Sequence, residues 1–301
     1  MTSISKGTVG NSGDYRIDNL TYGDKWNLAA DRTVTYSLHI ATYNHYWSSD
    51  EIATTDAAFQ AWENVANINF VREGSWYPWV EGINSPILTS SSDIVVMHAG
   101  SELNDVFEID GTVLGASMGL GSLATFQSLY DVYNASGMIS FDVNSSTYPN
   151  IAGDILINDS ASDWYLNLDA GESGFHTILH EIGHSLGLQH WGGDGYASSQ
   201  LYTAMSYNSV GGYSWAGNAA TPMPYDILAI QHLYGANNNY NTGDDTYLIA
   251  RDNQLKTIWD AGGTDTFDAK NISSYYDVVI DLREGGYSKI AQYMSTDAND
   301  T

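Results

Sequence analysis

Three closely spaced histidines place the strongest constraint on this chain. They occur in the pattern His180-Glu181-x-x-His184-x-x-Gly187-x-x-His190. Residues four apart share one face of a helix, so His180 and His184 can direct two imidazoles at one point. Glycine takes the left-handed turn at no steric cost, so Gly187 ends the helix and lets His190 return as a third ligand. Three imidazoles with an open fourth position are typical of a catalytic zinc ion.

Two further residues of this stretch bear on the chemistry. Glu181 adjoins His180 and projects next to the metal without having to bind it, where a general base would stand. His176 lies four residues before His180 and could compete as a ligand or contact the ligands. We favour a solvated histidine at the cleft edge, because His190 already completes the site.

Charge and composition exclude several classes of protein. The 301 residues carry a formal charge of −26, with only 10 Lys and Arg, so no general field attracts nucleic acid or an anionic membrane. No apolar run approaches the roughly 18 residues of a transmembrane helix. The chain has no cysteine, which excludes disulfides and thiolate metal sites. The acidic residues are mostly aspartate, which indicates either calcium sites or a solvated acidic surface.

Hydrophobic patterning predicts the secondary structure around the motif helix, which begins near residues 172–175. A second helix opens at the Ser48-x-x-Glu51 capping box and runs to about Val65, and a third spans 224–235. Alternating or apolar β-rich runs predict strands at 33–40, 67–71, 94–98, 138–141, 154–158 and 278–282.

Three connecting regions raise further expectations. We expect strand 154–158 to border the cleft and to pair with a substrate backbone, because it lies just before the motif helix. Residues 73–92 are predicted to form an aromatic loop that packs against the fold or binds substrate. Residues 111–121 are predicted to form a glycine-rich loop without phosphate-binding spacing.

Composition divides the chain into three parts. Residues 1–32 are polar and are predicted to form an N-terminal arm. Residues 33–235 hold the motif and the main strands and helices. Residues 236–301 are rich in Asn, Asp and Gly, with short β segments, so we place a domain boundary near 236.

The pattern resembles the metzincin clan of zinc endopeptidases, and more narrowly the serralysins, bacterial alkaline metalloproteases of the M10 group. Met205-Ser206-Tyr207 resembles the Met-turn of that family, and residues 226–237 resemble the helix that closes its protease domain. Residues 259–268 resemble the start of its calcium-binding β-roll. The resemblance runs from about Thr33 to Asp281. It implies an α+β fold, in which a twisted mixed sheet with an active-site helix precedes the start of a β-roll or β-sandwich domain.

The resemblance also assigns roles at the catalytic centre. It implies that the three motif histidines bind one zinc ion and that Glu181 acts as general base and then as acid. Met205 would form a hydrophobic floor under the metal without binding it. Tyr207 matches a tyrosine that is a fifth zinc ligand at rest and swings away to stabilise the oxyanion.

Calcium ligands are implied in the same way. One half of a site would consist of Asp260, Gly262 and Asp265. The other half would use mainly backbone oxygens, from Asn241, Gly243 and Asp245. A second site would share Asp265 and would include Gly263 and Glu284.

Three features depart from the family pattern. Trp191 stands where the family usually has proline. Residues 73–92 resemble an insertion. Gly262-Gly-Thr-Asp265 is only half of the nonapeptide repeat of a β-roll, so we expect a truncated chain or a shortened relative.

The resemblance implies a secreted zinc endopeptidase that acts on protein or peptide substrates as a monomer, without nucleic-acid or membrane partners. The N-terminus has no apolar segment typical of a Sec signal, which leaves a cytoplasmic protein, export by a signal elsewhere, or a signal already removed. The resemblance implies type I-like export. One alternative is a dedicated processing protease of narrow specificity. Another is a calcium-dependent binding module with an inactive or weakly active protease-like domain, although Glu181 argues against it.

Overall fold

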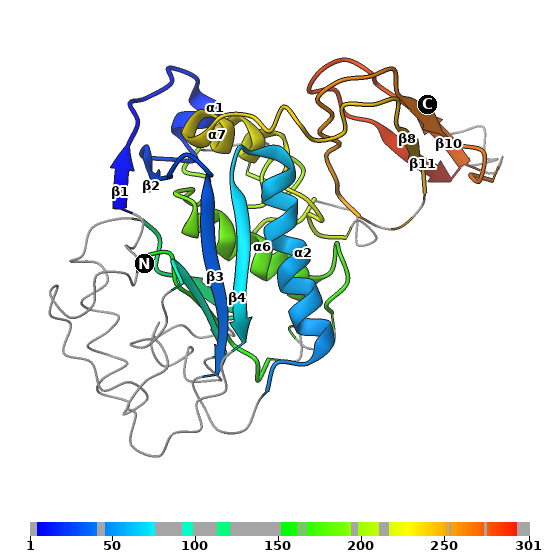
Figure 1. The fold of residues 1–301 in the computed structure, drawn as a ribbon. Helices are drawn as coiled ribbons and strands as arrows, with labels where there is room; N and C mark the ends of the chain where they lie inside the picture. Colours follow the sequence, from blue (N-terminus) through cyan, green and yellow to red (C-terminus); the bar gives the residue numbers. More distant parts are fainter. Residues whose placement is uncertain are drawn as a thin grey trace, which may run out of the picture.

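A five-stranded mixed sheet forms the centre of the molecule (Figure 1). The computed structural model describes residues 5–40, 46–75, 92–98, 113–120, 152–161, 164, 167–193, 198–210, 217–250, 252, 254–273 and 276–293. The strand order is β4-β3-β5-β7-β6. The strands are β3 (Thr33–Ile40), β4 (Asn69–Ser75), β5 (Ile94–His98), β6 (Gly115–Ser117) and β7 (Ile155–Ile157).

Four of these strands are parallel, and β6 alone runs antiparallel, along β7. The predicted strands 33–40 and 94–98 are confirmed, and β5 is buried along its whole length. The strand predicted at 67–71 begins two residues later, because Ala66 and Ile68 continue the turn after the preceding helix. The strand predicted at 138–141 and most of the aromatic segment 73–92 lie outside the described residues.

Two long helices pack against each other beside the sheet. Helix α2 (Ser49–Val65) begins at the predicted capping box, in which the Ser48 hydroxyl accepts from Glu51 N and Glu51 accepts from Ser48 N. Helix α6 (Ser173–Ser185) carries the histidine motif. The Trp62 indole of α2 donates to the Leu179 carbonyl of α6 at 3.0 Å, deep in the core. This contact between α2 and α6 therefore fixes the position of the motif helix along α2.

The N-terminal residues pack more closely than their polar composition suggests. They form β1 (Ser5–Thr8), the short helix α1 (Tyr15–Asp18) and β2 (Asp24–Asn27). Trp26 is buried, and its indole donates to the Ser185 carbonyl at 2.9 Å. The Thr21 hydroxyl donates to the Gly187 carbonyl at 2.8 Å. This segment thus holds the end of α6, and its α1 lies against α7 (Pro224–Tyr234), the predicted third helix (Figure 1).

Four short strands follow α7 and lie to one side of the central sheet (Figure 1). Strands β8 (Thr246–Leu248) and β9 (Thr266–Asp268) are parallel, whereas β10 (Tyr276–Val279) and β11 (Lys289–Tyr293) are antiparallel. Strand β10 begins earlier and ends earlier than the predicted 278–282. Two pairs of strands do not establish a β-roll, which stays a prediction.

Helices long and apolar enough to cross a bilayer are absent from the part of the chain that the structure describes.

Asp154, just before β7, provides a test of the core. Its Oδ1 accepts from Val95 N at 2.9 Å, but its buried Oδ2 has no hydrogen-bond partner within the described part of the chain. Burial raises the pKa of Asp154 well above its usual range. A raised folded-state pKa means that stability falls as pH rises above the unfolded value of about 3.9. Asp154→Asn should therefore stabilise the fold by roughly 1–3 kcal/mol at pH 8 and by little at pH 4.

Thermal unfolding at the two pH values measures this effect. Asp93→Asn is the matched control, because Asp93 accepts from both the backbone and the hydroxyl of Thr35 and should not gain from the change. Equal melting temperatures for wild type and Asp154→Asn at pH 8 would contradict the assignment.

Candidate active site

The end of α6 has the geometry that the motif predicts. The helix ends at Ser185, and Gly187 takes φ 101° in the left-handed region. A Cβ atom at Gly187 would lie 2.0 Å from the Asp24 carbonyl oxygen, so only glycine fits. Leu188 N then donates back to the Gly183 carbonyl at 2.9 Å. This turn reverses the chain and brings His190 over the helix face.

The three motif histidines converge on one point. The Nε2 atoms of His180 and His184 lie 3.1 Å apart, and each lies 3.1–3.2 Å from Nε2 of His190. Zinc–nitrogen bonds of about 2.0–2.1 Å in tetrahedral geometry place nitrogen ligands about 3.3 Å apart. The triangle of nitrogen atoms therefore has the size of three corners of such a site.

The tautomers of the first two histidines are set by carbonyl groups. Nδ1 of His180 donates to the Ala204 carbonyl and Nδ1 of His184 to the Leu188 carbonyl, both at 2.9 Å. Burial lowers the pKa of all three imidazoles, and that of His184 falls to about 4. Neutral rings with protonated Nδ1 direct Nε2 lone pairs at one another, which is unfavourable unless a cation lies between them.

Glu181 lies beside this triangle and under the sheet edge. It is buried, which raises its pKa to about 8, while a hydrogen bond from the Ser117 backbone N–H acts in the opposite direction. A Cβ atom at Gly115 would approach the Glu181 side chain to 3.0 Å, so β6 passes directly over the carboxylate. A cation held by the imidazoles would lower this pKa again.

The strand beside the cleft is not the one that the sequence predicted. Strand β7, which matches the expected 154–158, pairs with β5 on one side and β6 on the other. Its backbone groups are therefore occupied, and the expectation that it pairs with substrate is wrong. The sheet ends instead at β6, within the stretch 111–121 that was predicted to be only a loop. Its sequence Gly-Ala-Ser has no alternating apolar pattern that would predict a strand.

Tyr207 and Met205 both lie close to the motif, while the roles that the resemblance implies for them stay predictions. The Tyr207 hydroxyl lies 2.7 Å from Nε2 of His190, so it reaches the same point as the imidazoles. Although 75% of Tyr207 is exposed, partial desolvation and the nearby Glu181 raise its pKa to about 12, so the hydroxyl stays protonated. Met205 is fully buried, and its sulfur would lie 2.5 Å from a Cβ at Gly183, which makes it the packing partner of α6 behind the motif.

A buried carboxylate accepts hydrogen bonds from the residues just before Met205. Asp226, near the start of α7, accepts from Ala204 N at 2.6 Å, from the Thr203 hydroxyl at 2.5 Å and from Met223 N at 2.8 Å.

His176 is not one of the converging ligands. Its Nε2 lies 3.1 Å from the Ala204 carbonyl, so it supports the same peptide that His180 contacts.

Comparison with known proteins agrees with this geometry. Residues 25–235 match the matrixin model of peptidase family M10. The chain belongs to the matrixin family.

Among curated proteins, the chain is similar to several serralysins. It is 32% identical to the serralysin of Proteus mirabilis over 196 residues, which cover 55% of this chain and 40% of that protein. It is 35% identical to serralysin B of Dickeya chrysanthemi over 191 residues, covering 52% and 39%. It is 36% identical to a serralysin of Photorhabdus luminescens over 156 residues, covering 41% and 32%. These matches confirm the predicted resemblance, and they span about two fifths or less of each relative.

A second cluster of potential ligands lies beyond α7. Carboxylate oxygens of Asp245, Asp260 and Asp265 lie within 4.8 Å of one another. Asp265 accepts from Asp245 N at 2.9 Å, which joins the two loops. At Gly263, where φ is 124°, a Cβ atom would lie 1.8 Å from the Gly243 carbonyl oxygen. The two predicted half-sites therefore meet. Glu284 is exposed and outside the cluster, so its role stays a prediction.

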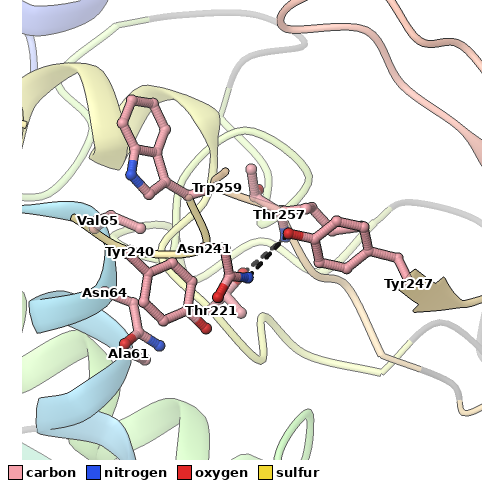
Figure 2. A pocket seen from close by; sticks show the side chains of 10 residues that line it. Ala61, Asn64, Val65, Thr221, Tyr240, Asn241, Tyr247, Thr257 and Trp259 are labelled. Atoms are coloured by element: carbon pink, nitrogen blue, oxygen red, sulfur yellow. Dashed lines mark hydrogen bonds between the residues drawn. The ribbon is translucent and has the colours of Figure 1, made fainter. Parts of the chain in front are cut away.

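A cavity of about 150 Å³ lies between the end of α2 and the acidic loops (Figure 2). Tyr247 lines it, and its hydroxyl accepts from the Asn241 amide and donates to Asp260. Trp259 lines the opposite part, where its indole donates to the Asn237 carbonyl at 3.0 Å. Aromatic side chains thus connect the acidic cluster to the matrixin region.

The sequence did not reveal the backbone groups that orient the ligands. The Ala204 and Leu188 carbonyls and the Ser117 N–H belong to small or apolar residues, whose side chains carry no sign of this role. Asp226 gave no signal either, because a carboxylate in the first turn of a helix is common, and only the structure shows that this one is fully buried.

Asp226→Asn tests the support of the Ala204 backbone. The amide nitrogen must replace either Oδ2, which accepts from two N–H groups, or Oδ1, which accepts from the Thr203 hydroxyl, so at least one present hydrogen bond is weakened and we expect a loss of about 1–3 kcal/mol in stability. Because the carbonyl of the same residue fixes His180, metal affinity should fall roughly 10–100-fold. Thermal unfolding and competition with a zinc chelator measure the two effects. Asp252→Asn, at a surface pair with Lys256, should change neither; an unchanged Asp226→Asn variant would refute this role.

Proposed function

We propose that this chain is a zinc-dependent endopeptidase. The observation that carries the proposal is the triangle of three Nε2 atoms with edges of 3.1–3.2 Å, next to the buried carboxylate of Glu181. The donor set fits zinc, because three neutral imidazoles and an open position are the usual ligands of catalytic zinc. Membership of the matrixin family supports the same reading.

Zinc bound by His180, His184 and His190 would supply Lewis acidity and a more acidic water. Glu181 would take a proton from the attacking water and transfer it to the departing amine. Its position under β6 excludes bulk solvent from the carboxylate, so the proton stays within the cleft. Water exclusion also strengthens each electrostatic contact in the site.

The Tyr207 hydroxyl is the candidate oxyanion donor. It stays protonated at neutral pH and already reaches the point where the histidines converge. A donor preorganised at the developing charge contributes most in a partly dry site. Rotation of the exposed ring would move the hydroxyl from this resting contact toward a substrate carbonyl.

The edge of β6 is the candidate binding surface for the substrate backbone. In the described part of the sheet, β6 pairs only with β7. An extended peptide could add to the other edge, which would place its backbone next to Glu181. We therefore infer protein or peptide substrates, without assigning the side chains that are preferred.

The remaining expectations follow from the similarity to serralysins. We propose that the enzyme is secreted through a type I-like route, acts as a monomer and uses calcium as a structural ion at Asp245, Asp260 and Asp265. The division at 235/236 is supported by the end of the matrixin match at residue 235. The part after 236 would be the N-terminal section of a calcium-binding domain.

Glu181→Gln separates chemistry from metal binding. The amide keeps the shape of the side chain but cannot take a proton, so casein cleavage should fall by about 10²–10⁴-fold while zinc content stays at one equivalent.

Tyr207→Phe tests the oxyanion donor. This variant should keep zinc and lose roughly 10²–10³-fold in kcat. Zymography with and without 1,10-phenanthroline, together with metal analysis, provides the measurement. Near wild-type cleavage by Glu181→Gln would rule out the proposed base, and an inactive wild type would favour a binding module.

Calcium removal tests the second cluster. EGTA should lower the melting temperature without extracting zinc, because carboxylate and backbone oxygens prefer a hard cation and imidazoles do not. Asp260→Asn should reduce the calcium-dependent part of that shift. Asp281→Asn, whose carboxylate pairs with Arg283 away from the cluster, is the control. A melting temperature that does not respond to calcium would remove the structural ion from the proposal.

A further inference from the structure

The three motif histidines are not supported in the same way. His180 and His184 each donate from Nδ1 to a carbonyl group, whereas His190 has no such acceptor among the described residues. His190 is also the most exposed of the three. Its ring position must therefore come from the chain on either side of it.

Backbone contacts tie this chain to the N-terminal segment. Gln189 N donates to the Leu20 carbonyl at 2.8 Å, and the Gln189 amide donates to the Asn19 carbonyl at 3.3 Å. Gly192 N approaches the same Asn19 carbonyl at 3.4 Å. The residues before and after His190 thus both rest on the end of α1.

Trp191 packs against two aromatic side chains at this point of contact. Its ring centroid lies 6.4 Å from that of Tyr15 on α1, edge to face, and 5.5 Å from that of Tyr225 on α7. The backbone folds back over the indole at Gly193, where a Cβ atom would lie 2.8 Å from the ring. The indole is therefore enclosed by α1, α7 and its own chain.

Polar bonding does not explain this placement. The buried indole N–H of Trp191 has no hydrogen-bond partner among the residues that the structure describes, a situation that usually costs about 1–3 kcal/mol. Aromatic packing offsets such a loss through buried area and edge-to-face contact. The ring is held in this place by its packing, and the adjacent residue is the ligand that lacks other support.

We propose that Trp191 is a positioning residue for the third metal ligand: its indole, held between Tyr15 and Tyr225, fixes the backbone that aims His190 at the other two imidazoles. The inference rests on the proposed zinc site. It assigns a role in metal retention to α1, which touches none of the reacting atoms.

Zinc retention by the full chain tests the proposal. Trp191→Ala should lose zinc to excess chromogenic chelator roughly 10-fold faster than wild type or more, as expected when the support of a ligand is removed. Trp191→Phe should restore most of the retention, because it keeps a ring between the two tyrosines. Tyr15→Ala should act in the same direction with a smaller effect, and its effect should not add to that of Trp191→Ala.

Two controls separate positioning from general destabilisation. Phe70→Ala removes a comparable ring that packs on Phe59, away from the site, and should lower the melting temperature without changing zinc loss. The visible spectrum of the cobalt(II)-substituted protein should weaken for Trp191→Ala, because a loosely held third imidazole yields to water, and should not change for Phe70→Ala.

The outcomes are distinct. Equal rates of zinc loss for Trp191→Ala and wild type, or an effect no larger than that of Phe70→Ala, would overturn the inference. If Trp191→Ala does not fold, Tyr15→Ala decides, and zinc loss from Tyr15→Ala no faster than from Phe70→Ala would also overturn the inference. A wild type that binds no zinc would refute the proposed function instead.

Discussion

The backbone of Ala204 is the contact on which the rest of the site depends. Its N–H is held by the buried carboxylate of Asp226, and its carbonyl accepts from Nδ1 of His180. The two backbone groups of this one residue thus join α7 to the motif helix, and the carbonyl sets the tautomer of a ligand. Met205 follows directly and packs behind α6, and Tyr207 comes two residues later at the cleft. Their positions are consequences of the same anchor.

Electrostatics favour a cation between the three histidines. The cleft buries a carboxylate and directs neutral nitrogen lone pairs at one another, each unfavourable in a dry environment. A divalent ion relieves both at once, because it accepts the lone pairs and stabilises the ionised form of Glu181. The acidic loops around Asp260 present the complementary situation, with carboxylates crowded on glycine turns. The two clusters therefore differ in the ligand atoms that they offer, nitrogen at the histidines and oxygen at the aspartates.

The sequence predicted the parts of the site that depend on local spacing. The histidine pattern, the turn at Gly187 and the capping box at Ser48 each follow from residues close in the chain, and the structure has all three. The cleft edge was assigned to the wrong strand, because pairing partners depend on the whole sheet and Gly115–Ser117 has no apolar alternation. The role of the N-terminal residues was missed for a related reason. Trp26 and Tyr15 stand in a polar context, and only the folded chain brings them to α6 and Trp191.

The three ligands differ in how far along the chain their supporting groups lie. His184 donates to Leu188, four residues away, and His180 donates to Ala204 in the next segment. His190 depends on carbonyls and rings from the start of the chain. A metal ion bound to all three would therefore cross-link helix, turn and N-terminal segment, and its binding free energy would stabilise their packing as well as the site. Loss of metal should then loosen the exposed His190 segment first. The helix that carries the other two ligands is held by the buried contact of Trp62 with Leu179.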